Sequence, residues 1–167
     1  MSTPAPVTPL QQLKVLAFAL ITAPLVMFAA MATVLGLSTD PPPLTIIVAL
    51  LATPVLAYLT AEAIGFRAAP LPAGRPHDAS SRAQVSLARY QSSTFVRFAV
   101  CELPILVALV ACFVLDHGLW PFAIVILPGV ALLAYETWPS GRNLDKYATA
   151  LERDGGSSLL RELGRPQ

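Results

Sequence analysis

Residues Leu44–Ile64 read LTIIVALLATPVLAYLTAEAI, and their only charged side chain is that of Glu62, close to the end of the run. At about 1.5 Å per residue, a helix of this length crosses a hydrocarbon core of about 30 Å. Three more apolar runs of similar length flank it in the chain. The sequence therefore predicts an all-α membrane protein with four transmembrane helices, over residues 15–37, 44–64, 95–115 and 119–137.

The composition agrees with a bilayer environment. Charged residues make up 13% of the chain and apolar residues 55%, against about 25% and 45–50% in soluble domains. A net charge of +1 excludes the strongly basic balance of nucleic-acid-binding proteins. The first run is longer than the 7–15 residues of a signal-peptide core, so we expect an uncleaved helix, although Ala30–Ala32 resembles a cleavage site.

The positive charges predict an orientation. All eleven Lys and Arg residues fall on one predicted side of the membrane, and positive charge near membrane ends stays cytoplasmic. We therefore expect a bacterial plasma-membrane protein with a cytoplasmic N-terminal segment (residues 1–14), a cytoplasmic middle loop and a cytoplasmic amphipathic tail (residues 138–167). Three helices around one buried soluble helix would not give so clean a split. The basic residues are Lys14, Arg67, Arg75, Arg82, Arg89, Arg97, Arg142, Lys146, Arg153, Arg161 and Arg165.

The two halves of the chain resemble each other. Phe18–Leu25 aligns with Phe98–Ile105 at an offset of 80 residues, each with a proline at the seventh position. Pro54 and Glu62 match Pro128 and Glu136, with the same spacing in both pairs. The pattern favours two tandem helical hairpins forming a parallel repeat, and chance agreement between apolar strings is the alternative.

Small residues recur every four positions along the second run. Such a stripe lets another backbone approach closely. Packing within the chain is the favoured interpretation, and an interface with a second subunit is the alternative. The stripe consists of Ala49, Thr53, Ala57, Ala61 and Gly65.

Glu102 is the most informative polar residue, about two turns into the third run from its cytoplasmic end. An ionised carboxylate at mid-bilayer costs about 2.5–3.5 kcal/mol. Arg97 lies about 140° away around the helix, so the partner of Glu102 must be another helix, water or a proton. We predict a polar cluster with a static ion pair of Arg97 with Glu62 or Glu102, and a proton or ion site is the alternative. Its members are Glu102, Arg97, Glu62, Glu136 and Tyr58.

The segment Tyr90–Val96 running into Ala99–Val107 resembles the second helix of the proteolipid (c-ring) subunit of rotary ATP synthases. By this resemblance Glu102 matches the ion-binding carboxylate of that family. The likeness covers about 25 of the 167 residues, and the family's glycine-repeat first helix is absent, so no activity is carried over. With nine Arg against two Lys, the chain also resembles small four-helix membrane proteins of GC-rich bacteria.

Two segments outside the predicted spans are amphipathic. Asp78 is expected to cap a helix through about Tyr90, and Asn143–Asp154 is expected to form a second helix with apolar residues on one face. Lying on an anionic inner leaflet is the favoured interpretation, and docking a protein partner is the alternative. The candidate lipid contacts are Arg82, Arg89, Arg142 and Lys146.

The sequence contains no triad, phosphate loop or metal-ligand spacing. We therefore expect a protein without enzymatic activity, cofactor or metal, which acts as an accessory or assembly subunit of a membrane complex. Its expected partners are the lipid bilayer and other membrane subunits or itself, with no nucleic acid. The alternative is a small proton- or cation-linked transporter or channel that uses Glu102.

Overall fold

The computed structural model describes residues 9–36, 40–71, 79–158 and 160–163. Within these residues the secondary structure is helical and contains no strand. The expected cap at Asp78 and the basic residues Arg75 and Arg165 lie outside the described residues. The helices are α1 (Pro9–Leu35), α2 (Leu44–Ile64), α3 (Ala79–Val114), α4 (Trp120–Thr137), α5 (Gly141–Glu152) and α6 (Leu160–Leu163).

Four of these helices are long and apolar enough to span a membrane, over Leu10–Leu35, Leu44–Ile64, Ser81–Val114 and Trp120–Thr137. The prediction of an all-helical chain with four helices long and apolar enough to span a membrane is confirmed. The third helix is longer than expected, because α3 begins at Ala79 and runs without a break through the predicted surface helix into the membrane span. No Gly or Pro interrupts residues 79–95, so nothing local ends the helix there.

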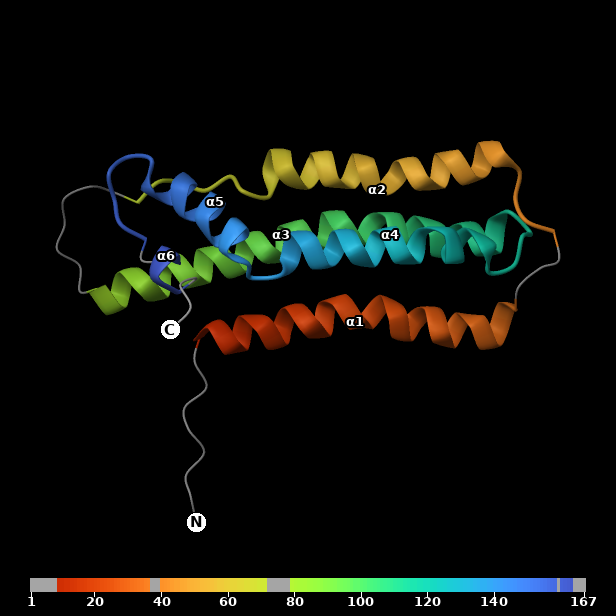
Figure 1. The fold of residues 1–167 in the computed structure, drawn as a ribbon, viewed down its shortest axis with the longest axis horizontal. Coiled ribbons are helices and arrows are strands. Elements are labelled where there is room, and N and C mark those ends of the chain that lie inside the picture. The colour runs from red at the N-terminus through yellow and green to blue at the C-terminus, as the bar shows by residue number, and fades with distance from the viewer. Residues whose placement is uncertain (1–8, 37–39, 72–78, 159, 164–167) are drawn as a thin grey trace, which may run out of the picture.

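The helices are arranged around a central pair. Figure 1 shows α3 and α4 side by side, with α2 along one side of the pair and α1 along the other. Helix α2 packs on both central helices, whereas α1 packs mainly on α4. Helices α3 and α4 thus form a close hairpin, while α1 and α2 are separated by the central pair, so the two predicted hairpins differ in their packing.

Close contact between α3 and α4 depends on Gly129. A methyl group at this position would overlap the side chain of Ile105. Around this crossing the side chains of Cys101, Ile105 and Phe122 are fully buried, and Phe28 of α1 meets Phe122 edge-on, with ring centroids 5.4 Å apart. Large apolar side chains such as Val110 remain exposed on the outside of the bundle, as expected where lipid is the solvent.

A second cluster of buried apolar side chains lies where α5 folds back over the bundle. We call this end of the bundle the α5 end. Ser140 caps α5 by accepting a hydrogen bond from the Asn143 backbone N–H, at 3.3 Å. The apolar face of α5 is buried in protein, which corrects the expectation that this face lies in the lipid leaflet. It packs with side chains from α1, α3, α6 and the segment after α2, and the cluster contains Leu13, Leu71, Tyr90, Leu144, Tyr147, Ala148, Leu151 and Leu160.

Candidate functional site

Arg97 occupies the centre of the polar cluster at the α5 end, with no exposed surface. Its Nη1 group donates to the backbone oxygen of Glu136 and its Nη2 group donates to Thr94 Oγ1 at 3.2 Å. The guanidinium also lies over the ring of Phe66, with Cζ 4.4 Å from the centroid. No carboxylate forms an ion pair with Arg97 among the described residues. The predicted pair of Arg97 with Glu62 or Glu102 is therefore wrong, and Arg97 instead caps the end of α4.

Two further side chains donate hydrogen bonds to backbone oxygens at the ends of α2 and α4. Asn143 is fully buried, and its Nδ2 group donates to the backbone oxygens of Tyr135, Glu136 and Trp138 at 2.9–3.1 Å. Ser93 Oγ donates to the backbone oxygen of Gly65 at 2.5 Å. The final carbonyls of a helix lack partners within that helix, so these bonds stabilise the ends of α2 and α4. The sequence did not indicate these roles of Asn143 and Ser93, because a single polar residue beside a span has no distinctive spacing.

Glu62 is the acidic centre of the ion pairs. Both Arg142 and Lys146 of α5 bind its carboxylate. Burial alone would lower the pKa of Arg142, but the hydrogen bond and charge of Glu62 outweigh burial and raise it. Arg142 also stacks on Tyr135, with Cζ 4.2 Å from the ring centroid, and the Tyr58 ring lies 6.3 Å from that of Tyr135. The structure thus brings Tyr58 to the edge of this cluster.

The same ion pairs bear on two of the candidate lipid contacts. Arg142 and Lys146 bind Glu62 within the chain but keep 31% and 40% of their side-chain surface exposed, so their contact with anionic lipids stays a prediction. Glu136 has no exposed surface. Its Oε1 atom lies 3.6 Å from Arg142 Nη1, and neither carboxylate oxygen has a hydrogen-bond partner among the described residues. Arg142 therefore links the acidic residues of α2 and α4.

Glu102 lies apart from this cluster. Ser93 is level with the end of α2, so nine residues of helix rise place Glu102 about 14 Å deeper, close to the middle of a hydrocarbon core of about 30 Å. This position is deeper than the two helical turns from the cytoplasmic end that the sequence predicted. The side chain is half-buried, one helical turn before exposed Leu106. No hydrogen bond or ion pair joins Glu102 to any residue that the structure describes.

The small-residue stripe of α2 packs inside the chain over half its length. Ala57, Ala61 and Gly65 are buried, Thr53 is half-buried, and Ala49 is exposed. A methyl group at Gly65 would overlap the side chain of Arg97. The favoured interpretation, packing within one chain, therefore holds for the half of the stripe nearest the polar cluster.

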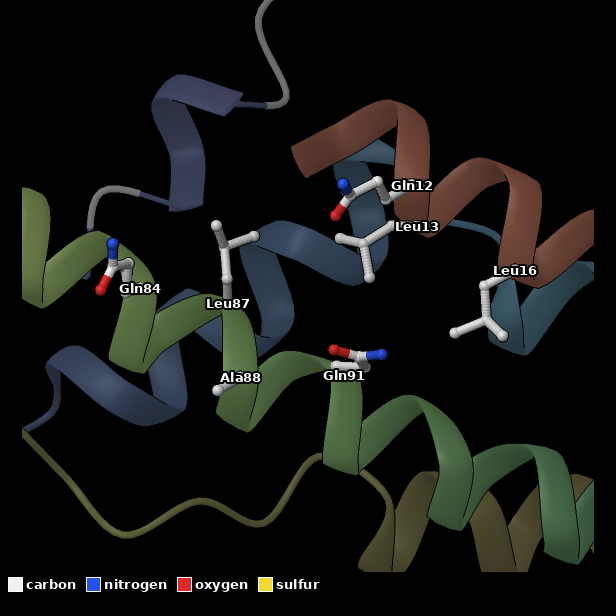
Figure 2. A pocket seen from close by; sticks show the side chains of 7 residues that line it. All are labelled: Gln12, Leu13, Leu16, Gln84, Leu87, Ala88 and Gln91. Carbon is white, nitrogen blue, oxygen red and sulfur yellow. The ribbon is translucent and has the colours of Figure 1, made fainter. Parts of the chain in front are cut away.

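A groove of about 360 Å³ separates the first turns of α1 from α3. In Figure 2, Leu87 and Gln91 extend from α3 toward Gln12, Leu13 and Leu16 of α1. Gln12, Gln84 and Gln91, which line this groove, are exposed and make no hydrogen bond within the described part of the chain. Gln84, Gln91 and Glu102 are seven and eleven residues apart, so they share one stripe of α3.

In the described ranges, no three His, Cys, Asp or Glu side chains lie close enough together to hold a metal ion. Cys101 and Cys112 are free and buried. The cluster at the α5 end consists of hydrogen bonds and ion pairs that join helices, and of the three glutamates in α2, α3 and α4 only Glu102 lies outside it.

The remaining two candidate lipid contacts lie on α3. Arg89 donates from Nη1 to the backbone oxygen of Ala69 at 2.9 Å, and Arg82 is half-buried.

Comparison of the chain with protein-family models, with curated proteins and with solved structures gives no match.

Proposed function

We propose that this chain is a non-enzymatic accessory or assembly subunit of a membrane complex, which associates through the seam between α1 and α3. The observation that carries the proposal is the position of Glu102. Its carboxyl group lies near mid-membrane, half-buried on the bundle surface, without a partner in the described residues. Leaving an ionised carboxylate at that depth costs about 2.5–3.5 kcal/mol, and a neighbouring subunit that donates to Glu102 would remove this cost.

The groove at the start of the same seam supports this assignment. Gln84 and Gln91 continue the Glu102 stripe toward the α5 end. At about 1.5 Å per residue, Gln91 and Gln84 lie about 3 and 14 Å beyond the level of Ser93, so their amides are available to the part of a partner helix that emerges from the membrane. A second membrane helix lying along α3 would meet one carboxyl and two amide groups in register, whereas the lipid-facing side of α2 offers mainly apolar contacts.

Site-specific photo-crosslinking in native membranes tests the proposal. A photoreactive residue at Leu106, one turn from Glu102, should give a discrete adduct with a membrane protein or with a second copy of the chain. The same residue at Val48 on the lipid-facing side of α2 (59% exposed) is the matched control and should react with lipid. The proposal fails if the two positions give the same products and the purified protein is strictly monomeric in mild detergent.

The second candidate is a small proton- or cation-linked transporter or channel that uses Glu102. It shares the supporting observation, because a partnerless intramembrane carboxylate often marks a proton or ion site. Phe95 and Phe98 lie between Gln91 and Glu102 along α3, however, so the approach from the α5 end along this stripe is apolar. This arrangement favours association over transport.

Flux measurements separate the candidates. A transporter predicts that Glu102→Gln abolishes proton or cation flux in liposomes while the fold survives. A subunit predicts no flux in either protein and weaker association of Glu102→Gln, because the amide has lost the charge.

We also propose that the α5 end faces the cytoplasm of a bacterial cell and that the two halves arose by tandem duplication. The one-sided distribution of Lys and Arg supports the orientation, and the shared Pro–Glu spacing supports the duplication. A cysteine replacing Arg82 should be protected from impermeant reagents in intact cells. Labelling of that cysteine from the outside would reverse the orientation.

A further inference from the structure

A second pocket lies at the α5 end on the side of α2 and α3, away from the α1–α3 seam. It has a volume of about 400 Å³ and is lined by the end of α2, the segment that follows it, one face of α3 and Tyr147. Ser93, in its wall, is bonded to Gly65 at the last turn of α2. The pocket therefore lies at the level where the hydrocarbon-spanning part of α2 ends.

Two arginines give this pocket its charge. Arg67 and Arg89 both line it, and neither forms an ion pair with a carboxylate of the described chain. Each uses one donor to hold its position, since Arg67 Nε bonds Ala63 O and Arg89 Nη1 bonds Ala69 O, both at 2.9 Å. A guanidinium carries five N–H donors, so each retains donors for an anion.

The rest of the lining favours a lipid over a free anion. Ile64 and Val96, 41% and 46% exposed, form the apolar side of the pocket toward the membrane span. The lining contains no carboxylate, so it offers nothing to the cationic amine of a zwitterionic headgroup. Paired guanidinium groups above an apolar wall fit a phosphate diester whose acyl chains continue down the outside of α2 and α3.

We propose that this pocket binds the headgroup phosphate of an anionic phospholipid, with Arg67 and Arg89 as its ligands. The site is independent of the association proposed for the α1–α3 seam. It differs from general attraction to an anionic leaflet because it assigns one lipid to one place. It also gives Arg67, which the sequence did not distinguish from the other basic residues, a specific role.

Native mass spectrometry of the full chain in mild detergent tests this assignment. The protein is titrated with phosphatidylglycerol or phosphatidylcholine, and the affinity for the first bound lipid is measured. The variants are Arg67→Gln and the double variant Arg67→Gln/Arg89→Gln. The matched control for Arg67→Gln is Arg153→Gln, which removes one charge from an exposed position outside the pocket. If the double variant is unstable, Arg67→Gln alone still tests the proposal, because the Arg67 side chain hydrogen-bonds only to the backbone oxygen of Ala63, four residues earlier.

The unmodified protein should prefer phosphatidylglycerol, and Arg67→Gln should weaken its binding about tenfold, the loss of one charge-assisted contact. The control should bind like the unmodified protein. Equal affinities in Arg67→Gln and the control would overturn the proposal. Inorganic phosphate that displaces the lipid at equal concentration would also overturn it, because the apolar wall would then contribute nothing.

Discussion

Glu62 and Glu102 are both carboxylates within apolar helices, but their surroundings are opposite. Glu62 is bound by Arg142 and Lys146 of α5, at the edge of a network that also holds Arg97. Glu102 lies deeper, where desolvation costs more, and has no partner in the described residues. The difference shows which polar groups the chain satisfies by folding. The network at the α5 end joins helices of one chain, whereas we propose that Glu102 is contacted by a neighbouring subunit.

The network has a clear structural role. The last carbonyls of α2 and α4 would face an apolar surrounding, and Ser93, Arg97 and Asn143 supply donors to them. An unmade buried hydrogen bond costs about 1–3 kcal/mol, so these donors stabilise the bundle. We therefore expect changes in the network to lower stability and changes at Glu102 to alter association.

The largest loss of stability is expected for Arg97→Ala. The change removes the hydrogen bonds to Glu136 O and Thr94 Oγ1, removes the cation–π contact with Phe66, and leaves a cavity beside Gly65. We expect a loss of about 3 kcal/mol or more in the free energy of unfolding, measured by denaturant titration in one detergent. Arg153→Ala, at an exposed position, should change it by less than about 0.5 kcal/mol. Similar values for the two variants would refute the role of Arg97.

Gly65→Ala is expected to have the next largest effect. The new methyl group would overlap the Arg97 side chain and displace it from its bonds, at a cost of about 1–3 kcal/mol by the same measurement. Gly141→Ala is the matched control, because a methyl group there meets nothing within 4 Å. A destabilised Gly141→Ala protein beside an unaffected Gly65→Ala protein would contradict the packing described for Arg97.

The smallest effect concerns Glu152, outside the membrane helices. Burial alone would raise its pKa, but hydrogen bonds from Ser158 and the charge of Arg161 outweigh burial and hold the pKa below its ordinary value. Because the folded pKa is the lower one, this stabilisation is present at neutral pH and is lost as the pH falls below about 4.5. Hydrogen exchange at the Ser158 amide should accelerate over that range, and Glu152→Gln should abolish the pH dependence beyond that of intrinsic exchange. An unchanged pH dependence in Glu152→Gln would contradict this role.

The sequence predicted the membrane helices because length and apolarity alone decide whether a segment spans hydrocarbon. It also predicted that Glu62 and Glu136 lie at the same end of the bundle, since each stands near the end of its span and the second and fourth spans run in the same direction. It did not predict their partners, because Arg142 and Asn143 reach the cluster only when α5 folds back over the helix ends. The packing of α5 inside the protein was also not predicted, because an amphipathic face fits a lipid leaflet and a protein surface equally well.

The central claim is that another polypeptide covers Glu102. Its most direct test is the photo-crosslinking yield at Leu106 in native membranes, compared between the unmodified protein and Glu102→Leu. We predict that the discrete protein adduct is lost in Glu102→Leu, while the isolated variant unfolds at the same temperature as the unmodified protein or a higher one. An adduct that persists at full yield, or a variant that unfolds at a markedly lower temperature, would contradict the claim, since Glu102 would then act within its own chain.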